Sequence, residues 1–421
     1  MSASLTRVKK RRVFHIPGYD PIHPRRYREL YRKEGSAQAQ ISGYKVGLQA
    51  APSQNTFRWN VTARIAGHDV SAQIDVLVWS DIVRTSMAQT IPATYLQLLK
   101  TAWIYISTGT LRRLMWMRKG PVIAALYPVL MLLGQLATGV IAGRIVGGYV
   151  GRILHRFIGT GETVLFTIAD WGIWAIEWAL LAVITVTILR WFKSIDNKLF
   201  AYYLMHDYAF SAHYKGAIPP ALEARMADFG DLIAQALSED IEEVLIVGHS
   251  SGAHLAVSIL ADLIRGGRVP KGGPKLAFLS LGQVVPMVSF LPNADRLRRD
   301  LAFLSAASDV TWVDVTAPGD GCCFALCDPV AVTGVAPDDK LWPLVISAAF
   351  TQSLTPARWK ALRWRFFRLH FQYLCAFDQP KDYDYFQITA GPILLRDRYA
   401  DRKPSKLRID VPVSKYTSMK P

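Results

Sequence analysis

The stretch EEVLIVGHSSG, residues 242–252, decides the fold class of this chain. After two acids it continues as a run of large apolar residues, which is typical of a strand buried on both faces of a parallel sheet. Residues 253–264 follow with the apolar periodicity of a helix. A strand, a tight Gly-x-Ser-x-Gly turn and a helix therefore succeed one another directly. This order predicts that the hydroxyl of Ser250 is raised above the edge of a sheet.

Other segments continue the alternation of strands and helices. We expect strands at residues 12–16, 56–65, 70–78, 275–281 and 310–315, a strand around 367–371, and helices at 221–237 and 253–264. Such alternation predicts an α/β fold, in which a mostly parallel sheet is flanked by helices. The segment 396–421 is basic and without periodicity, so we expect an extended tail.

Two long apolar stretches interrupt this pattern. Residues 122–142 contain no charged side chain, and residues 164–189 contain only two, Asp170 and Glu177. About 20 apolar residues suffice to cross a bilayer as a helix, so we expect a transmembrane helical hairpin. The expected organisation is an N-terminal part of one domain (1–115), the hairpin (116–195), the C-terminal part of the same domain (196–395) and the basic tail (396–421).

The charges of the chain point to a membrane surface. Lys and Arg number 49 against 33 Asp and Glu, a net charge of +16, yet only 19% of the residues are charged, where about 25% is usual. The basic pairs are scattered and no nucleic-acid-binding motif accompanies them, so we expect membrane lipids and not nucleic acid as partners. More cations flank the outer ends of the hairpin than its connection, which predicts that the termini and the main domain are cytoplasmic. The cations compared are Arg112, Arg113, Arg118, Lys119, Arg190, Lys193 and Lys198 at the outer ends and Arg144, Arg152 and Arg156 near the connection.

Four glycines recur at a spacing of four along the first apolar stretch and its continuation. They are Gly139, Gly143, Gly147 and Gly151. This spacing places them on one helix face, where another helix can approach closely. We expect this face to contact either the second span or another copy of the chain in a homo-oligomer. Asp170 and Glu177 share a face of the second span, where Arg144 is the expected partner of Asp170 and a proton or substrate relay is the alternative role.

A serine hydroxyl becomes a strong nucleophile only when a histidine takes its proton and an acid orients that histidine. Two histidines follow Ser250 in the chain. His254 lies one helical turn further on and cannot easily swing back to the hydroxyl. His370 is therefore the expected base.

The acid is expected between the serine and the histidine, in a loop just after a strand. Asp320 follows the strand predicted at 310–315 and fits best, and Asp328 is the alternative. Asp314 lies within that strand, where a structural hydrogen bond is the expected role.

Acyl transfer also requires donors for a developing oxyanion. One is expected to be the backbone N–H of Ser251, the residue after the nucleophile. The second is expected in the turn after the first strand, where Gly18 allows a close approach and Tyr19 offers its N–H. No cofactor or metal is expected, because the cysteines at 322, 323 and 327 have no histidine beside them to complete a zinc site.

These elements, in this order, resemble the α/β-hydrolase superfamily, particularly its lipase and esterase branch, and the membrane-anchored bacterial members. The resemblance covers residues 12–21, 242–265 and 310–375. It implies an α/β-hydrolase-type sheet with an inserted transmembrane hairpin, and Ser250, Asp320 and His370 as nucleophile, acid and base. The early loop is His-Ile-Pro-Gly instead of His-Gly-Gly-Gly, and the hairpin interrupts the domain before the nucleophile turn.

The expected function is therefore hydrolysis of a carboxylic ester, of a lipid or an acylated amphiphile, through an acyl-enzyme on Ser250. The resemblance implies a bacterial inner-membrane location, with two spans and the catalytic domain in the cytoplasm. Acyl transfer by the same three residues is one alternative. A non-catalytic membrane interaction protein built on the same fold is the other.

Overall fold

The computed structural model describes the chain except for residues 1–6, 54–55, 88–89, 160, 162 and 421. It divides into two compact units. The first comprises Met1–Ser86, Trp103–Ala124 and Ser211–Pro421, and the second comprises Met87–Ala102 and Ala125–Phe210. The second unit is thus inserted in the sequence of the first, and it is larger than the hairpin expected at 116–195.

The first unit contains an eight-stranded sheet with the order β2-β3-β4-β1-β5-β6-β7-β8. β1 pairs in parallel with β4 and β5, and β5 to β8 are parallel to one another, whereas β2, β3 and β4 form an antiparallel meander at one edge. The sheet is mostly parallel, as the sequence predicts. The strands are β1 (Lys10–Ile16), β2 (Lys45–Ala51), β3 (Phe57–Ile65), β4 (His68–Val76), β5 (Glu243–His249), β6 (Lys275–Leu281), β7 (Val310–Thr316) and β8 (Leu344–Ser347).

The apolar pattern of each strand matches its place in the sheet. Every residue of β5 and β7 is buried, because central parallel strands are covered on both faces. Along β3, near the edge, buried and exposed residues alternate from Trp59 to Ile65, so one face of this strand meets the core and the other meets solvent. The continuous and the alternating patterns in the sequence therefore distinguish central strands from the meander.

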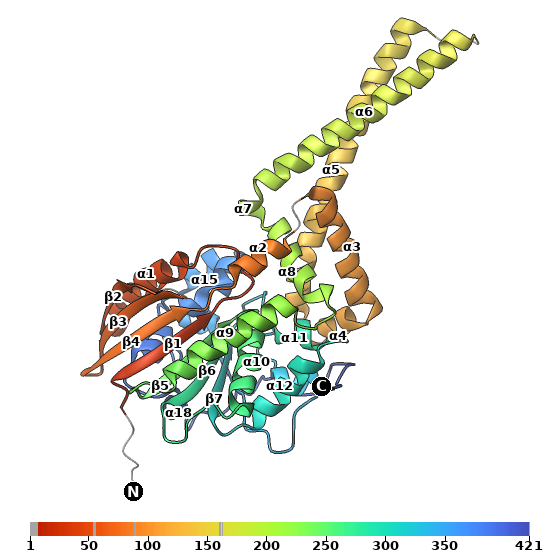
Figure 1. Cartoon of the computed structure of the whole chain (residues 1–421). Coiled ribbons are helices and arrows are strands. Elements are labelled where there is room, and N and C mark those ends of the chain that lie inside the picture. The colour runs from red at the N-terminus through yellow and green to blue at the C-terminus, as the bar shows by residue number, and fades with distance from the viewer. Residues whose placement is uncertain (1–6, 54–55, 88–89, 160, 162, 421) are drawn as a thin grey trace. The chain divides into compact units, whose positions relative to one another are not determined.

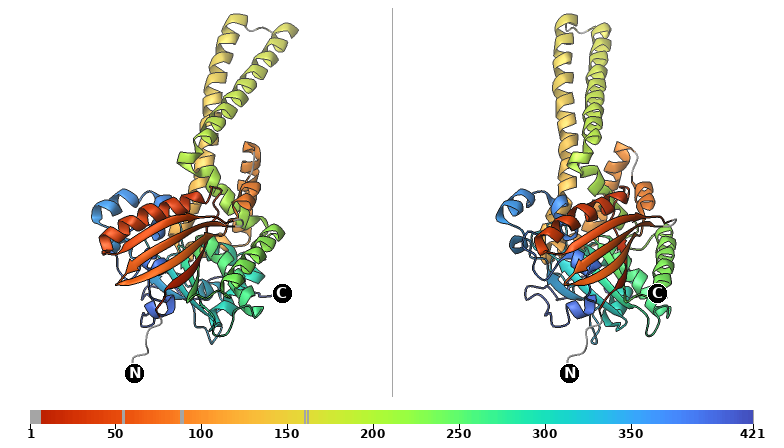
Figure 2. Two further views of the ribbon diagram at one scale, coloured as in Figure 1. Left: turned by 60° about the vertical axis from the view of Figure 1, so that its left-hand side comes forward. Right: turned by 90° about the vertical axis from the view of Figure 1, so that its left-hand side faces the viewer.

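Helices cover both faces of the sheet (Figures 1 and 2). One face packs on α1, α16, α17 and the 3-10 helix η1. α10 contacts β5, α9 and α12 on the other face. The helices of the first unit are α1 (Arg25–Ser42), α2 (Ser80–Ser86), α4 (Thr110–Met117), α9 (Pro220–Ala236), α10 (Gly252–Arg265), α11 (Val285–Ser289), α12 (Asp295–Ala306), α13 (Pro329–Thr333), α14 (Phe350–Ser353), α15 (Pro356–Leu362), α16 (Phe366–His370), η1 (Gln372–Leu374), α17 (Tyr385–Ala390) and α18 (Leu395–Arg398).

The direction of the chain connections changes at the ends of β1 and β5. These two strands are neighbours, and the chain leaves β1 toward α1 on one face and leaves β5 toward α10 on the other. Loops that diverge to opposite faces leave a crevice beyond the carboxyl ends of the strands, which is where α/β proteins bind ligands. Ser250 and Gly18 both follow these two ends.

One expected strand is wrong, and the C-terminal segment has contacts that the sequence does not indicate. The aromatic segment around 367–371 forms the helix α16 and not a strand, because a short apolar run has no periodicity that separates the two structures. The segment 396–421 is expected to be an extended tail. After α18 it runs in extended form along the first unit, where the amide of Ser405 donates to the carbonyl of Val345 and that of Ile409 to Leu326.

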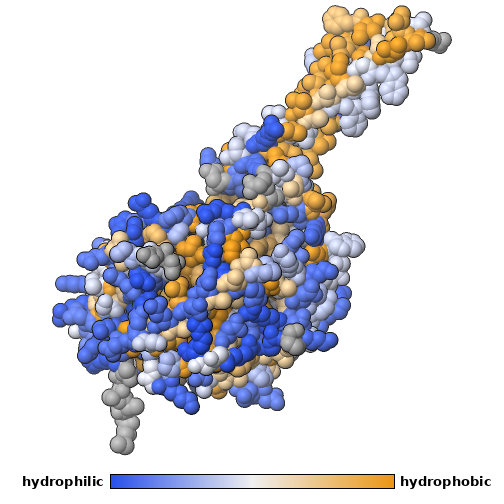
Figure 3. Space-filling view, in the orientation of Figure 1, coloured by the Kyte–Doolittle hydropathy of each residue, from blue (hydrophilic) through white to orange (hydrophobic). Residues whose placement is uncertain are grey.

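The second unit contains two helices long and apolar enough to cross a membrane. α5 (Lys119–Ile158) has 40 residues and α6 (Val164–Ser194) has 31, about 60 and 46 Å of helix, against a hydrocarbon core of about 30 Å. In the most apolar 18-residue stretch of each helix, only 22% of α5 and 17% of α6 is buried. Hydrophobic residues therefore lie along the surface of these two helices (Figure 3). The other helices that lie wholly or partly in the second unit are α3 (Ile91–Ser107), α7 (Asp196–Leu199) and α8 (Ala201–His213). The second unit extends beyond the hairpin because Leu98, Leu132 and Met205 form one cluster.

The glycine face of α5 packs directly on α6. A side chain at Gly143 would lie 2.8 Å from Leu181 Cα, and one at Gly147 would lie 2.9 Å from the carbonyl oxygen of Glu177. The backbones thus approach as closely as small residues permit. Of the two expected partners, the second span fills this face, so self-association through it would require α6 to be displaced.

The predicted pair of Arg144 and Asp170 is wrong. Asp170 lies 3.5 Å from Nδ1 of His155, and the guanidinium of Arg144 lies 6.0 Å from the ring of Trp178. In an antiparallel hairpin, residues at equal distance from the connection face each other. Asp170 is nearer to the connection than Arg144 is, so it meets a later residue of α5.

Replacement of Gly143 by leucine is expected to separate α5 from α6 and to destabilise the hairpin by about 1–3 kcal/mol, because the side chain has no space against Leu181. Gly134→Leu in the same helix is the matched control, since nothing lies within 4 Å of its added Cβ. Thermal unfolding in lipid nanodiscs, followed by tryptophan fluorescence, compares the two variants. Equal midpoints would contradict the close helix contact.

A second prediction concerns Asp314 in β7. It is fully buried, its Oδ1 accepts a hydrogen bond of 2.5 Å from Ser280 Oγ, and burial raises its pKa from 3.8 to about 8. Between these values the folded protein holds a proton that the unfolded chain has released, so stability falls as the pH rises. Asp314→Asn is expected to flatten this dependence, measured as unfolding midpoints between acid and weakly alkaline pH. An unchanged slope would show that this carboxyl does not cause it.

Candidate functional site

Ser250 occupies a strained turn between β5 and α10. Its φ is +56°, a left-handed conformation that non-glycine residues seldom adopt. The amide of Ser250 donates to the carbonyl of Leu281 at 2.9 Å, and α10 begins two residues later at Gly252. A side chain at Gly252 would overlap the carbonyl oxygen of Ile16. The turn therefore requires glycine at this position and leaves the serine half-buried above the end of the strand.

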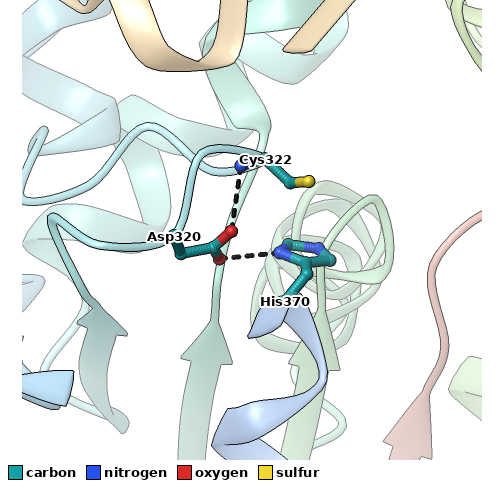
Figure 4. A group of neighbouring side chains, drawn as sticks. All are labelled: Asp320, Cys322 and His370. Atoms are coloured by element: carbon teal, nitrogen blue, oxygen red, sulfur yellow. Dashed lines mark hydrogen bonds and ion pairs between the residues drawn. The ribbon is translucent and has the colours of Figure 1, made fainter. Parts of the chain in front are cut away.

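Asp320 and His370 form a short hydrogen bond in the interior. Oδ2 of Asp320 lies 2.7 Å from Nδ1 of His370, and Oδ1 accepts the amide of Cys322 at 2.9 Å (Figure 4). Burial alone would raise the pKa of Asp320, but the charge of His370 and these hydrogen bonds hold it below its usual value. The carboxylate is therefore ionised where it faces the imidazole, which fixes the orientation of the ring.

Two further residues hold this pair, and neither was expected from the sequence. The hydroxyl of Tyr373 donates to Asp320 Oδ2 at 3.0 Å and accepts the amide of Ala317 at 2.9 Å. His249, the residue before the serine, donates through Nε2 to the carbonyl of His370 at 3.0 Å, and the two rings lie 4.8 Å apart. Burial, followed by the charge of His370, lowers the pKa of His249 well below its usual value, so this ring stays neutral. The aromatic run around 370 is the only signal in the sequence for Tyr373.

His370 and Ser250 each approach a residue at the end of β6. Leu281 accepts the amide of Ser250, and a side chain at the next residue, Gly282, would lie 3.0 Å from Cε1 of His370. Nε2 of His370 is buried and has no hydrogen-bond partner among the described residues, Ser250 included. Hydrogen bonds of this kind are often long without substrate. Ser250 and the imidazole thus approach successive residues at the end of β6, Leu281 and Gly282, and Nε2 is left available.

The loop after β1 lies against the serine. A side chain at Gly18 would meet Ser250 Cβ at 3.0 Å and Oγ at 3.4 Å. The loop is anchored by Tyr19, whose hydroxyl bonds Ser86 Oγ at 2.7 Å, and by Trp79, whose indole donates to the carbonyl of Pro17 at 3.0 Å. Tyr19 therefore follows a residue that lies against the serine, and Ser251 is the N-cap of α10; the roles of their N–H groups as oxyanion donors stay predictions.

Asp328, the alternative acid, has a different role. Its Oδ1 accepts the amides of Val330 and Ala331 at the start of α13, and its Oδ2 pairs with Lys340 Nζ at 2.6 Å. The side chain is a helix cap joined to a cation. Among the two candidate acids, the structure brings only Asp320 to His370.

Asp320, Cys322 and His370 also offer ligand atoms within 4.8 Å of one another, close enough to hold a metal ion. In this structure the carboxylate and the imidazole already bond each other directly. An ion would have to replace that hydrogen bond. The donor set therefore suits a charge pair better than a metal centre.

Comparison with known proteins gives no relative: no family model, no curated protein and no solved structure matches the chain. The chemistry of the site is therefore argued from its own geometry.

The two acids are expected to respond differently to removal. Asp328→Ala is expected to lower stability by about 0.5–2 kcal/mol, since it removes a helix cap, and to leave the reactivity of Ser250 unchanged. Asp320→Asn is expected to slow that reactivity by roughly four orders of magnitude, because the amide donates to Nδ1 and holds the imidazole in the tautomer whose Nε2 cannot accept a proton. Unfolding midpoints and the rate of serine labelling by a fluorophosphonate separate the two effects. Asp328→Ala keeps Asp320. If this variant were labelled more slowly than wild type, the assignment of Asp320 as the acid would be contradicted.

Proposed function

We propose that this protein is a membrane-anchored serine hydrolase that cleaves a carboxylic ester through an acyl-enzyme on Ser250. One arrangement supports it most: a serine stands in a strained strand-to-helix turn, and an imidazole that a buried carboxylate orients approaches the same strand end to which the serine is bonded. Strained backbone persists where the surroundings enforce it, and it is concentrated at functional sites. An α/β-hydrolase fold is part of this proposal.

In the proposed reaction Ser250 Oγ attacks the ester carbonyl while Nε2 of His370 takes its proton. His370 then gives this proton to the leaving alcohol, and the acyl group stays on the serine. Water, deprotonated by the same imidazole, releases the acid and restores the enzyme. The N–H groups of Ser251 and Tyr19 would hold the oxyanion, and Asp320 stabilises the imidazolium that forms at each step.

A lipid or another acylated amphiphile is the proposed class of substrate, because the chain also contains two helices suited to a bilayer. Neither helix is mostly buried, and neither lies at the N-terminus, so a soluble core helix and a signal sequence explain them less well. The proposed location is a bacterial inner membrane with the catalytic unit on the cytoplasmic side. Cysteine accessibility at the hairpin connection tests that orientation.

A fluorophosphonate probe tests the nucleophile. The purified protein in nanodiscs is expected to be labelled at one residue, and Ser250→Ala is expected to lose labelling completely. Ser251→Ala is the matched control, because it removes a neighbouring hydroxyl and keeps the backbone N–H that the mechanism uses. Labelling is followed by in-gel fluorescence and by mass spectrometry of the modified peptide.

Wild-type protein that resists the probe, or equal labelling of Ser250→Ala, would falsify the proposal. Product analysis with a short-chain acyl ester, with and without an added alcohol, then separates hydrolysis from transfer to an acceptor.

A further inference from the structure

A cleft of about 720 Å³ lies beside the loop that leads to Asp320. Three segments form it: the loop after β7, the end of β8 with α14, and the extended segment 402–408. Small-molecule sites have volumes of about 300–1,000 Å³ and combine an apolar lining with a few polar groups. Here the exposed residues Pro318, Pro404 and Leu407 supply apolar surface, and the segment 402–408 supplies cations.

The cations of the cleft are only partly neutralised. Arg402 pairs with Asp382, and Arg408 pairs with Asp410, both outside the cleft. Lys403 and Lys406 are exposed and make no ion pair within the described part of the chain. No acidic residue is among the described residues that line the cleft. Two ammonium groups are therefore available to an anion.

Two residues that line the cleft have a strained backbone, which a chance gap on the surface would not require. Leu326 and Ala349 both line it, and both have left-handed backbone, with φ of +59° and +46°. Left-handed conformations of this kind are costly in side-chain-bearing residues and are concentrated at binding and catalytic sites. Two backbone hydrogen bonds hold the segment that contains the lysines. The amide of Ser405 donates to the carbonyl of Val345 at 2.9 Å, and the amide of Ile409 donates to that of Leu326 at 2.7 Å.

We propose that this cleft binds an acidic amphiphile, whose apolar part lies on Pro318, Pro404 and Leu407 and whose anionic group binds Lys403 and Lys406. The site is distinct from the serine and goes beyond the proposed hydrolysis. The two are neighbours, because the ring of Phe350 lies 4.9 Å from that of Tyr373, which donates to Asp320.

Octyl phosphate is the probe, titrated by calorimetry into the full chain in zwitterionic nanodiscs. Octyl glucoside, with the same chain and no charge, and inorganic phosphate, with the charge and no chain, are the comparisons. The double variant Lys403→Gln/Lys406→Gln is expected to weaken binding of octyl phosphate about tenfold, by loss of two exposed ion pairs. Lys271→Gln/Lys275→Gln is the matched control, since these exposed lysines lie before and at the start of β6, whereas the cleft is lined by residues after β7 and at the end of β8.

Ser250→Ala is expected to bind octyl phosphate as wild type does, which separates this proposal from that of hydrolysis. Binding should also weaken with added salt, because exposed charges are screened. Three outcomes overturn the proposal: equal weakening in the control variant, octyl glucoside binding as tightly as octyl phosphate, or inorganic phosphate binding as tightly as octyl phosphate. The last result would assign the cleft to free phosphate.

Discussion

The tight exit of the chain from β5 is the constraint on which the rest of this structure depends. β5 lies in the middle of the sheet, and both of its faces are buried. The chain therefore has to turn away at the end of this strand. It turns into α10 through Ser250, in left-handed backbone, and through Gly252, which passes against the carbonyl of Ile16. The same contact brings the loop after β1 over the serine. A single steric requirement thus brings two loops together and holds Ser250, half-buried, at the strand end.

Electrostatics in an apolar interior explain the arrangement around the histidine. A buried carboxylate is costly unless donors surround it, and Asp320 has His370, Tyr373 and the amide of Cys322. These donors keep the acid ionised, and the ionised acid orients the imidazole. His249 adds a neutral ring and one hydrogen bond behind it. The base is therefore held by three elements that are far apart in the chain, the turn after β5, the loop after β7 and η1.

The hairpin follows a different physical rule. In α5 and α6 the apolar side chains face outward, and the contact between the helices is made by glycines and backbone. Such a contact suits a lipid environment. Burial of apolar surface contributes little to the association of two helices there, and close packing stabilises the contact instead. The cleft beside β8 combines the opposite properties, apolar surface with uncompensated lysines, on the unit that contains the serine.

The α/β class, the strands β1 and β3 to β7, the turn at Ser250 and both apolar helices were predictable, because each depends on local periodicity or on a short motif. Other elements were not: α16 was predicted as a strand, and β2, β8 and α1 were missed, since their apolar patterns are weak. The candidate nucleophile and base followed from chain order. The choice of Asp320 over Asp328, the support from Tyr373 and His249, and the docking of segment 402–408 depend on contacts between residues distant in sequence. Local patterns specify which elements form, and only packing in three dimensions decides which side chains meet.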